Sequence, residues 1–203
     1  CCTREQRDAL ADERYRVVID TAFGYGTLKV GEVVAPGASD DCVVLCAHLC
    51  HPAMANDDLT GVAVGVAVMR ELLTRRDLRY TYRLVVVPET VGSVAWLSRN
   101  EALIPHMRGG LFLEMLGTAL PPALQHSFQG DTSVDRCFAQ ALRRHAPDGW
   151  AGPYRTVIGN DERQFNAPGV RVPMLSLARV LPQHHPDAPY REYHSSADTP
   201  AVV

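Results

Sequence analysis

The sequence predicts an α/β fold with three layers, in which helices cover both faces of a mostly parallel central sheet. Short apolar runs typical of buried strands, such as residues 42–47 and 81–87, alternate with longer segments of helical length. This alternation is typical of parallel strands joined by helical crossovers. The chain has 203 residues, 46% of them hydrophobic, which suffices for one well-buried core. We therefore expect a single domain over residues 1–203.

The N-terminal part is expected to form a β-hairpin. Residues 15–22 and 27–34 are rich in strand-forming side chains, and the glycines of the intervening FGYG permit a tight reversal. After a Pro-Gly turn, residues 42–47 form a continuous apolar run that predicts a buried strand ending at His48. An exposed edge of the hairpin could pair with a second copy of the chain, so a homo-oligomer is a further expectation.

The rest of the chain continues the alternation of strands and helices. Residues 59–76 are long enough for a helix, with small residues for close packing and arginines in the last turn that suit the helix dipole. The remaining predicted elements are a strand at 81–87, a helix near 91–103, a strand at 110–116, a helix at 134–145, a segment at 154–158, a short helix after Asp161 and a strand at 172–178.

Charge and composition argue against two classes of partner. The net charge of −3 and the scattered lysines and arginines give no electrostatic footprint for nucleic acid or an anionic membrane. The apolar runs are far shorter than the ~20 residues needed to cross a bilayer, and no signal segment opens the chain. We expect a cytoplasmic protein. Its six cysteines lie mostly in apolar contexts, which predicts reduced thiols.

Several polar side chains fall where metal-binding and catalytic groups gather in open α/β sheets. His48, Glu89 and Glu114 each lie at or near the carboxyl end of a predicted strand, and His194 lies in a late loop that could return to the same edge. Asp57 stands at a predicted helix start, where backbone N–H groups can fix a carboxylate. Imidazoles and carboxylates are the ligands that catalytic zinc prefers. The candidate ligands are His48, Asp57, Glu114 and His194.

Simpler interpretations exist for some of these residues. Asp57 or Asp58 could cap the helix, and Glu89 could be held by N–H groups at the next helix start. Two strand-end glutamates buried without a cation would repel each other, which a shared metal would prevent. Cys50 and His51 could form a nucleophile with its base, but adjacent residues on an extended segment point apart. His51, which precedes Pro52, more simply contacts a metal ligand or lines the pocket than binds the metal itself.

Five segments resemble, in order and spacing, the co-catalytic zinc aminopeptidase clan, which includes leucyl aminopeptidases and glutaminyl cyclases. They are AHLCHPAMANDDLTG, VPETVGS, LFLEMLG, GNDERQFNAPGVRVPMLSL and EYHSSADTP. The resemblance covers nearly the whole chain and is closest to a branch of aminopeptidase-like proteins linked to polysaccharide biosynthesis, of the DUF4910 type. It implies a zinc exopeptidase-like fold.

The resemblance also implies roles for individual residues. His48 and Glu114 would bind a first metal, Asp57 would bridge two metals, and His194 would bind the second. Glu89 matches the general base. Residues implied to support these or to contact the substrate are Asp58, which is joined to Asp57 in a strained loop typical of the family, Asp161 before a short helix, Asp198, which would orient His194, and Tyr193, which flanks His194.

Two positions depart from the clan pattern. The general base is usually followed by a second glutamate that binds the second metal, where this chain has Thr90, and a hydroxyl is a poor substitute for that carboxylate. An acid usually orients the first histidine, where this chain has Cys50. We therefore expect one firmly bound zinc and a weak or absent second ion. The single ion would be held by His48, Asp57 and Glu114, or by a rearranged set that includes His194 or His51. Accessory segments of the branch are not evident either, so the chain, which starts without Met, could be a fragment that lacks accessory domains.

The predicted function is hydrolysis of a peptide or amide bond in a small substrate, by zinc-activated water with Glu89 as the base. A catalytically idle metal- or ligand-binding domain is the alternative, which Thr90 and Cys50 favour and the presence of Glu89 disfavours. A third interpretation, cyclisation, follows from the resemblance to glutaminyl cyclases.

Overall fold

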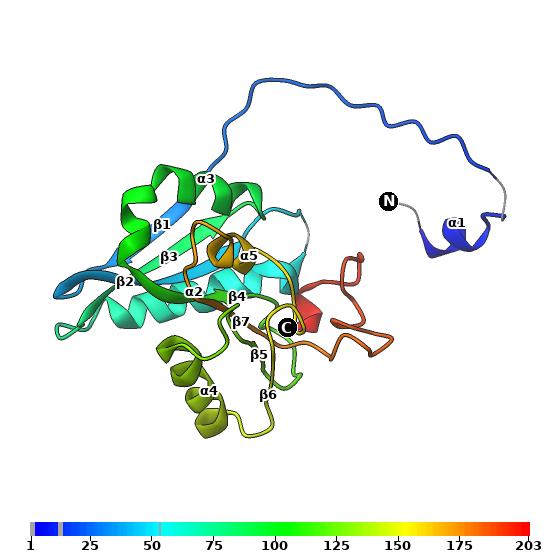
Figure 1. The fold of residues 1–203 in the computed structure, drawn as a ribbon. Helices are drawn as coiled ribbons and strands as arrows, with labels where there is room; N and C mark the ends of the chain where they lie inside the picture. Colours follow the sequence, from blue (N-terminus) through cyan, green and yellow to red (C-terminus); the bar gives the residue numbers. More distant parts are fainter. Residues whose placement is uncertain (1–2, 12–13, 53) are drawn as a thin grey trace.

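The structure, a computed structural model, describes residues 3–11, 14–52 and 54–203. Within these residues, one sheet contains the strands β1 (Gly31–Ala35), β2 (Ser39–His48), β3 (Tyr80–Val87), β4 (Met107–Leu113), β5 (Ala123–Gln125), β6 (Trp150–Gly152) and β7 (Met174–Ala178). Their order in the sheet is β1-β3-β2-β4-β7-β5-β6 (Figure 1). The central strands β3, β2, β4 and β7 are parallel, whereas β1 pairs antiparallel with β3 and β5 antiparallel with β7.

Helices cover both faces of this sheet. On one face, Trp96 and Phe165 pack around Phe112 of β4, and on the other face Met69 and Phe138 pack near Leu111. These side chains come from different helices, which Figure 1 shows on opposite sides of the sheet. The helices are α1 (Arg4–Asp8), α2 (Thr60–Leu72), α3 (Val91–Arg99), α4 (Ser133–His145) and α5 (Glu162–Asn166), with the irregular turns η1 (Ala55–Leu59), η2 (Glu101–His106) and η3 (Pro200–Val202). The predicted three-layer α/β fold with a mostly parallel sheet is confirmed.

The register of the central strands brings three chain segments to one edge. His48, the last residue of β2, lies opposite Val87, the last residue of β3. Leu45 and Cys46 of β2 lie opposite Leu111 and Phe112, so β4 ends at nearly the same level. Glu89 and Glu114 therefore leave the sheet beside His48, as the strand-end argument requires.

The predicted N-terminal hairpin is wrong. Residues 14–30 contain no strand, and Figure 1 shows this segment running away from the sheet. Part of the predicted second strand does pair, as β1, but its partner is β3. A two-stranded ribbon alone is marginally stable, whereas β1 extends an existing sheet. The homo-oligomer expected from the hairpin edge loses that basis and stays a prediction. Large apolar side chains left exposed in this segment are Tyr15, Val17, Val18, Ile19, Phe23, Tyr25 and Leu28.

Other boundaries shift by a few residues or more. The predicted helix 59–76 is shorter, as α2, and η1 precedes it; the predicted helix near 91–103 ends at Arg99 and continues as η2. The predicted segment 154–158 is a turn region. The short strands β5 and β6 were not predicted, because three residues are too few to show an alternating pattern.

The described cysteines are free thiols, namely Cys42, Cys46, Cys50 and Cys137, while Cys1 and Cys2 lie outside the described residues. Burial raises the pKa of Cys42 and Cys46, which keeps them protonated core residues. Among the described helices, none is both long and apolar enough to cross a membrane.

Candidate metal centre

Three buried ligand-type side chains converge where β2 and β4 end. The Nε2 atom of His48 lies 3.1 Å from Oδ1 of Asp57 and 3.4 Å from Oε1 of Glu114. His48 is 1% exposed, and Asp57 and Glu114 are each 2% exposed. One atom from each residue lies within 4.8 Å of the other two, which is close enough for one ion to contact all three. We call this set, formed by His48, Glu114 and Oδ1 of Asp57, the inner site.

The carboxylate of Asp58 fixes the inner site to the sheet. Its Oδ1 atom accepts hydrogen bonds from the backbone N–H groups of Gly61 (2.9 Å) and Met115 (3.0 Å), and Oδ2 accepts one from the N–H of His48 (3.4 Å). The peptide between Asp57 and Asp58 is cis. A Cβ atom at Gly61 would lie 2.4 Å from the Asp58 carboxylate oxygens, so only glycine permits this approach. Asp58 thus holds the ends of β2 and β4 and the start of α2 together.

A second carboxylate, from the far end of the chain, holds the backbone of Asp57. Asp198 accepts hydrogen bonds from the N–H groups of Asn56 (2.8 Å) and Asp57 (3.2 Å), and from the hydroxyl of the buried Tyr190 (2.8 Å). We expected Asp198 to orient His194. Its contacts instead orient η1, the turn that carries Asp57.

A buried polar chain supports Glu114 from behind. The side-chain amide of Asn160 donates to Oε1 of Glu114, and its backbone N–H donates to Glu162 (2.7 Å), which also accepts a hydrogen bond from Gln125 (3.1 Å). Burial raises the pKa of Glu162 to about 8. Asn160 and Glu162 are not among the predicted site residues, although both flank Asp161 in the GNDERQF segment, and an acid in the first turn of a helix is a usable signal.

The other oxygen of Asp57 faces a second group. Oδ2 lies 3.0 Å from Nε2 of His194, which is 52% exposed and has a left-handed φ of 52°. Ligand atoms of His51, Asp57 and His194 all lie within 4.8 Å of one another, and the rings of the two histidines are 5.2 Å apart. We call this set, formed by His51, His194 and Oδ2 of Asp57, the outer site. Tyr193 stacks on the His194 ring at 3.8 Å.

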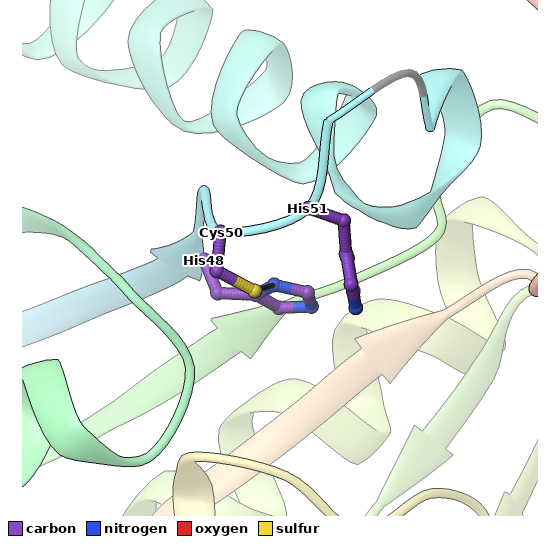
Figure 2. Close-up of side chains that lie close together, drawn as sticks. All are labelled: His48, Cys50 and His51. Atoms are coloured by element: carbon purple, nitrogen blue, oxygen red, sulfur yellow. Dashed lines mark hydrogen bonds between the residues drawn. The ribbon is translucent and has the colours of Figure 1, made fainter. Parts of the chain in front are cut away.

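Cys50 and His51 extend toward the same side as His48 (Figure 2). The sulfur of Cys50 lies 3.4 Å from Nδ1 of His48, at the position where the clan carries an acid. The Cys50 side chain therefore contacts the ring nitrogen that is turned away from Asp57 and Glu114. His51 is partly buried and its ring lies 5.7 Å from that of His48.

Glu89 leaves β3 on the neighbouring strand and is partly buried. The next residue, Thr90, has a left-handed φ of 62°, which a β-branched residue rarely adopts, at a cost of about 1–3 kcal/mol. Asp161 holds this turn, because it accepts hydrogen bonds from the N–H of Thr90 (2.9 Å) and the hydroxyl of Ser93. The backbone that carries Glu89 is thus fixed by Asp161.

The charges of the inner site suit a dication. Burial opposes protonation of His48, but the carboxylates of Asp57 and Glu114 outweigh it and raise the pKa of His48 to about 12. Burial raises the pKa of Glu114, and burial also raises the pKa of Asp58 well above its ordinary value, with Glu114 adding to that shift. For Asp57, burial is outweighed by His48 and other nearby histidines, and the pKa is lowered.

Buried polar atoms without a hydrogen-bond partner also mark the inner site as a place where a cation fits. His48 Nε2, Asp57 Oδ1 and Glu114 Oε2 are buried without a partner in hydrogen-bond geometry among the described residues. Buried polar atoms are normally satisfied, and an ion bound here would satisfy these three. One imidazole and two carboxylates are an established zinc donor set, and the residues present therefore fit the metal that the motifs imply.

Comparison with known proteins places the chain in a family. The family model described as domain of unknown function (DUF4910) matches residues 19–203. The chain belongs to this family. A curated relative from Clostridium acetobutylicum, described as a candidate polysaccharide biosynthesis protein with an aminopeptidase-like domain, is 33% identical over 196 residues. That match covers 97% of this DUF4910 chain and 43% of the relative, so the chain spans less than half of the relative's length.

Solved structures agree with the fold predicted from the motifs. A candidate peptidase from Clostridium acetobutylicum is similar with a TM-score of 0.82 and 32% identity, over 100% of the DUF4910 chain and 46% of that chain. An aminopeptidase from Aneurinibacillus sp. strain AM-1 has a TM-score of 0.67 at 18% identity, over 86% and 42% of the two chains. A glutaminyl cyclase from an Acidobacteriales bacterium has a TM-score of 0.66 at 16% identity, over 87% and 67%. The DUF4910 chain thus has an aminopeptidase-like fold, as the motifs predicted.

Proposed function

We propose that this DUF4910 chain is a zinc-dependent hydrolase that cleaves a peptide or amide bond in a small substrate. The observation that carries the proposal is the position of Asp57, whose two oxygens face His48 on one side and His194 on the other. A carboxylate that only capped a helix would have its oxygens on backbone N–H groups, a task that Asp58 performs here.

The chemistry is divided among groups at one edge of the sheet. His48, Asp57 and Glu114 would hold the zinc ion. When bound, zinc polarises a carbonyl and lowers the pKa of a water molecule toward ~7. Glu89 would take the proton from the attacking water and pass it to the leaving amine.

Tyr193 would line the substrate side of this site. Burial and then the negative charges of Asp57, Glu114 and Glu89 raise the pKa of Tyr193, so its hydroxyl keeps its proton. That hydroxyl lies in the field of the same carboxylates and can donate a hydrogen bond to a bound group.

The test is a screen of fluorogenic aminoacyl and amide substrates with zinc-loaded protein, in parallel with Glu89→Gln. If Glu89 is the base, the variant loses about 10²–10⁴ of the rate while its zinc content stays the same. Glu101→Gln, which alters an exposed glutamate, is the matched control.

Equal turnover by Glu89→Gln would remove Glu89 from this role. A wild-type protein that holds zinc in the inner site and turns over no substrate in the screen would favour the alternative, a catalytically idle metal-binding domain.

A further inference from the structure

We infer that His51 supplies the outer site with the ligand that Thr90 lacks, so that His51, Asp57 and His194 bind a second divalent ion of the zinc type. This inference rests on the proposed function for its inner metal, and it replaces the expectation of a weak or absent second ion.

The outer site has a complete set of donors without Thr90. Ligand atoms of His51, Asp57 and His194 lie mutually within 4.8 Å, and the two imidazoles with one carboxylate form a zinc donor set that leaves a fourth position open. Their position relative to the inner site is set by Asp57, which offers Oδ1 inward and Oδ2 outward. Neither ion would need the other's nitrogen ligand.

His51 itself is placed for binding. Its Nδ1 atom is buried and has no hydrogen-bond partner among the described residues, which is uncommon for a buried imidazole nitrogen. Figure 2 shows the His51 side chain extending from its loop so that the end of its ring comes near the end of the His48 ring. The His51 and His194 rings meet edge-on, with their planes 69° apart, and a ring nitrogen of each lies within 4.8 Å of the other and of an Asp57 oxygen.

One rival arrangement uses the same histidine. His48, Cys50 and His51 also offer ligand atoms within 4.8 Å of one another. That set would take Nδ1 of His48, which contacts the Cys50 sulfur, and it has neither a carboxylate nor a use for His194. The outer site is favoured because it accounts for both Asp57 Oδ2 and His194. Since the rival requires a thiolate ligand and the outer site does not, the two are separable by spectroscopy.

The experiment is metal binding by the intact chain, measured by equilibrium dialysis with zinc and by cobalt substitution. Wild type is expected to bind two equivalents. His51→Phe keeps a ring of similar shape without nitrogens, and is expected to bind one equivalent tightly, with the second weakened by about 100-fold or more. His184→Ala, which removes an exposed histidine, should still bind two.

Cys50→Ala discriminates the rival arrangement. It should keep two equivalents, and cobalt-loaded wild type should show no thiolate-to-cobalt charge-transfer band. Circular dichroism checks that each variant is folded. Should His51→Phe not fold, His194→Ala, which changes an exposed residue, tests the outer site in its place and is also expected to bind one equivalent tightly and the second weakly.

The outcomes separate this inference from the proposed function. One equivalent in wild type at saturating zinc, two tight equivalents in His51→Phe, or a thiolate band lost in Cys50→Ala would each overturn it. Two His51-dependent equivalents without any hydrolysis would support it while the proposed function fails. Glu89-dependent hydrolysis by a protein that binds a single ion would support the proposed function and overturn this inference.

Discussion

The inner and outer sites share one carboxylate and differ in how their other ligands are held. His48 and Glu114 lie at the ends of adjacent central strands, are buried, and are fixed by Asp58 and Asn160. His51 and His194 lie on loops, and His194 is half exposed with a left-handed backbone. Ligands on strands are positioned by the sheet before any ion arrives, whereas loop ligands gain order from the ion itself. We therefore expect the inner site to bind first and more tightly.

The largest loss of zinc binding is expected from a change of Asp57, the residue that the two sites share. Structural zinc sites bind with about 10–16 kcal/mol, so loss of a ligand common to both sites should weaken total zinc binding by more than about 100-fold. Asp57→Ala is the variant, measured by competition with a chromophoric chelator, and Asp187→Ala on an exposed loop is the control. Unchanged affinity in Asp57→Ala would mean that the two sites do not share this carboxylate.

The next largest loss of zinc affinity is expected when the hydrogen bonds that hold the backbone of Asp57 are removed. Asp198→Ala removes the acceptor for two backbone N–H groups of η1, and positioning partners of this kind are typically worth 10–100-fold in metal affinity. Tyr190→Phe keeps the carboxylate and loses one hydrogen bond, worth about 1 kcal/mol of stability. Zinc titration of both variants should therefore show a large loss only for Asp198→Ala. Equal losses would assign the effect to general destabilisation.

The pH dependence of stability tests the buried polar chain that supports the inner site, in which Glu162 contacts Asn160 and Asn160 contacts Glu114. The pKa of Glu162 is raised from 4.5 to about 8. Between these values the folded chain holds a proton that the unfolded chain has released, so stability falls as pH rises, by at most about 1.4 kcal/mol per unit. Glu162→Gln removes this titration and should flatten the free energy of unfolding over that window.

Urea unfolding of wild type and Glu162→Gln at about pH 5.5 and 7.5 measures this difference in slope. Glu101→Gln, at an exposed position, should keep the wild-type slope. Parallel slopes for wild type and Glu162→Gln would show that Glu162 titrates normally.

The smallest effect is expected at Cys50, which contacts His48 on the side away from the inner ligands. Cys50→Asp would give Nδ1 of His48 a carboxylate partner in place of a thiol and should tighten inner-site zinc binding by about tenfold. Cys50→Ala, which has no acceptor, should change it little. The comparison uses the same chelator competition, and weaker binding by Cys50→Asp would contradict the assigned contact.

Much of the fold followed from strand-length apolar runs, because buried parallel strands are short, continuous and bounded by turns. The ends of β2 and β3 were predictable to within a residue, and this is why His48 and Glu89 were placed at the correct edge. The hairpin failed because pairing partners are chosen over long distances: residues 27–34 contain a good strand, but the best available edge belonged to β3.

For the site, sequence motifs indicated which residue types to expect but not their contacts. The placement of Asp57 between two histidines depends on a turn held by Asp198, and neither hydrogen bond is visible in local spacing. From the sequence, His51 before Pro52 is predicted to contact a metal ligand or line the pocket rather than bind the metal itself. The turn after His48 instead directs its ring toward His194. Asn160 and Glu162 act through a chain of contacts that no single motif encodes.

The hydrogen bonds from η1 to Asp198 also set an order of events during synthesis. Asp57 and Asp198 are 141 positions apart, and translation proceeds from the N-terminus. While the nascent chain is still emerging, β2 and α2 can form, but the turn between them has no carboxylate to hold it and His194 is absent. Metal binding at the outer site would therefore have to wait until residues 194–198 have left the ribosome, and a translation product stalled before them would carry His48 and Asp57 without His194.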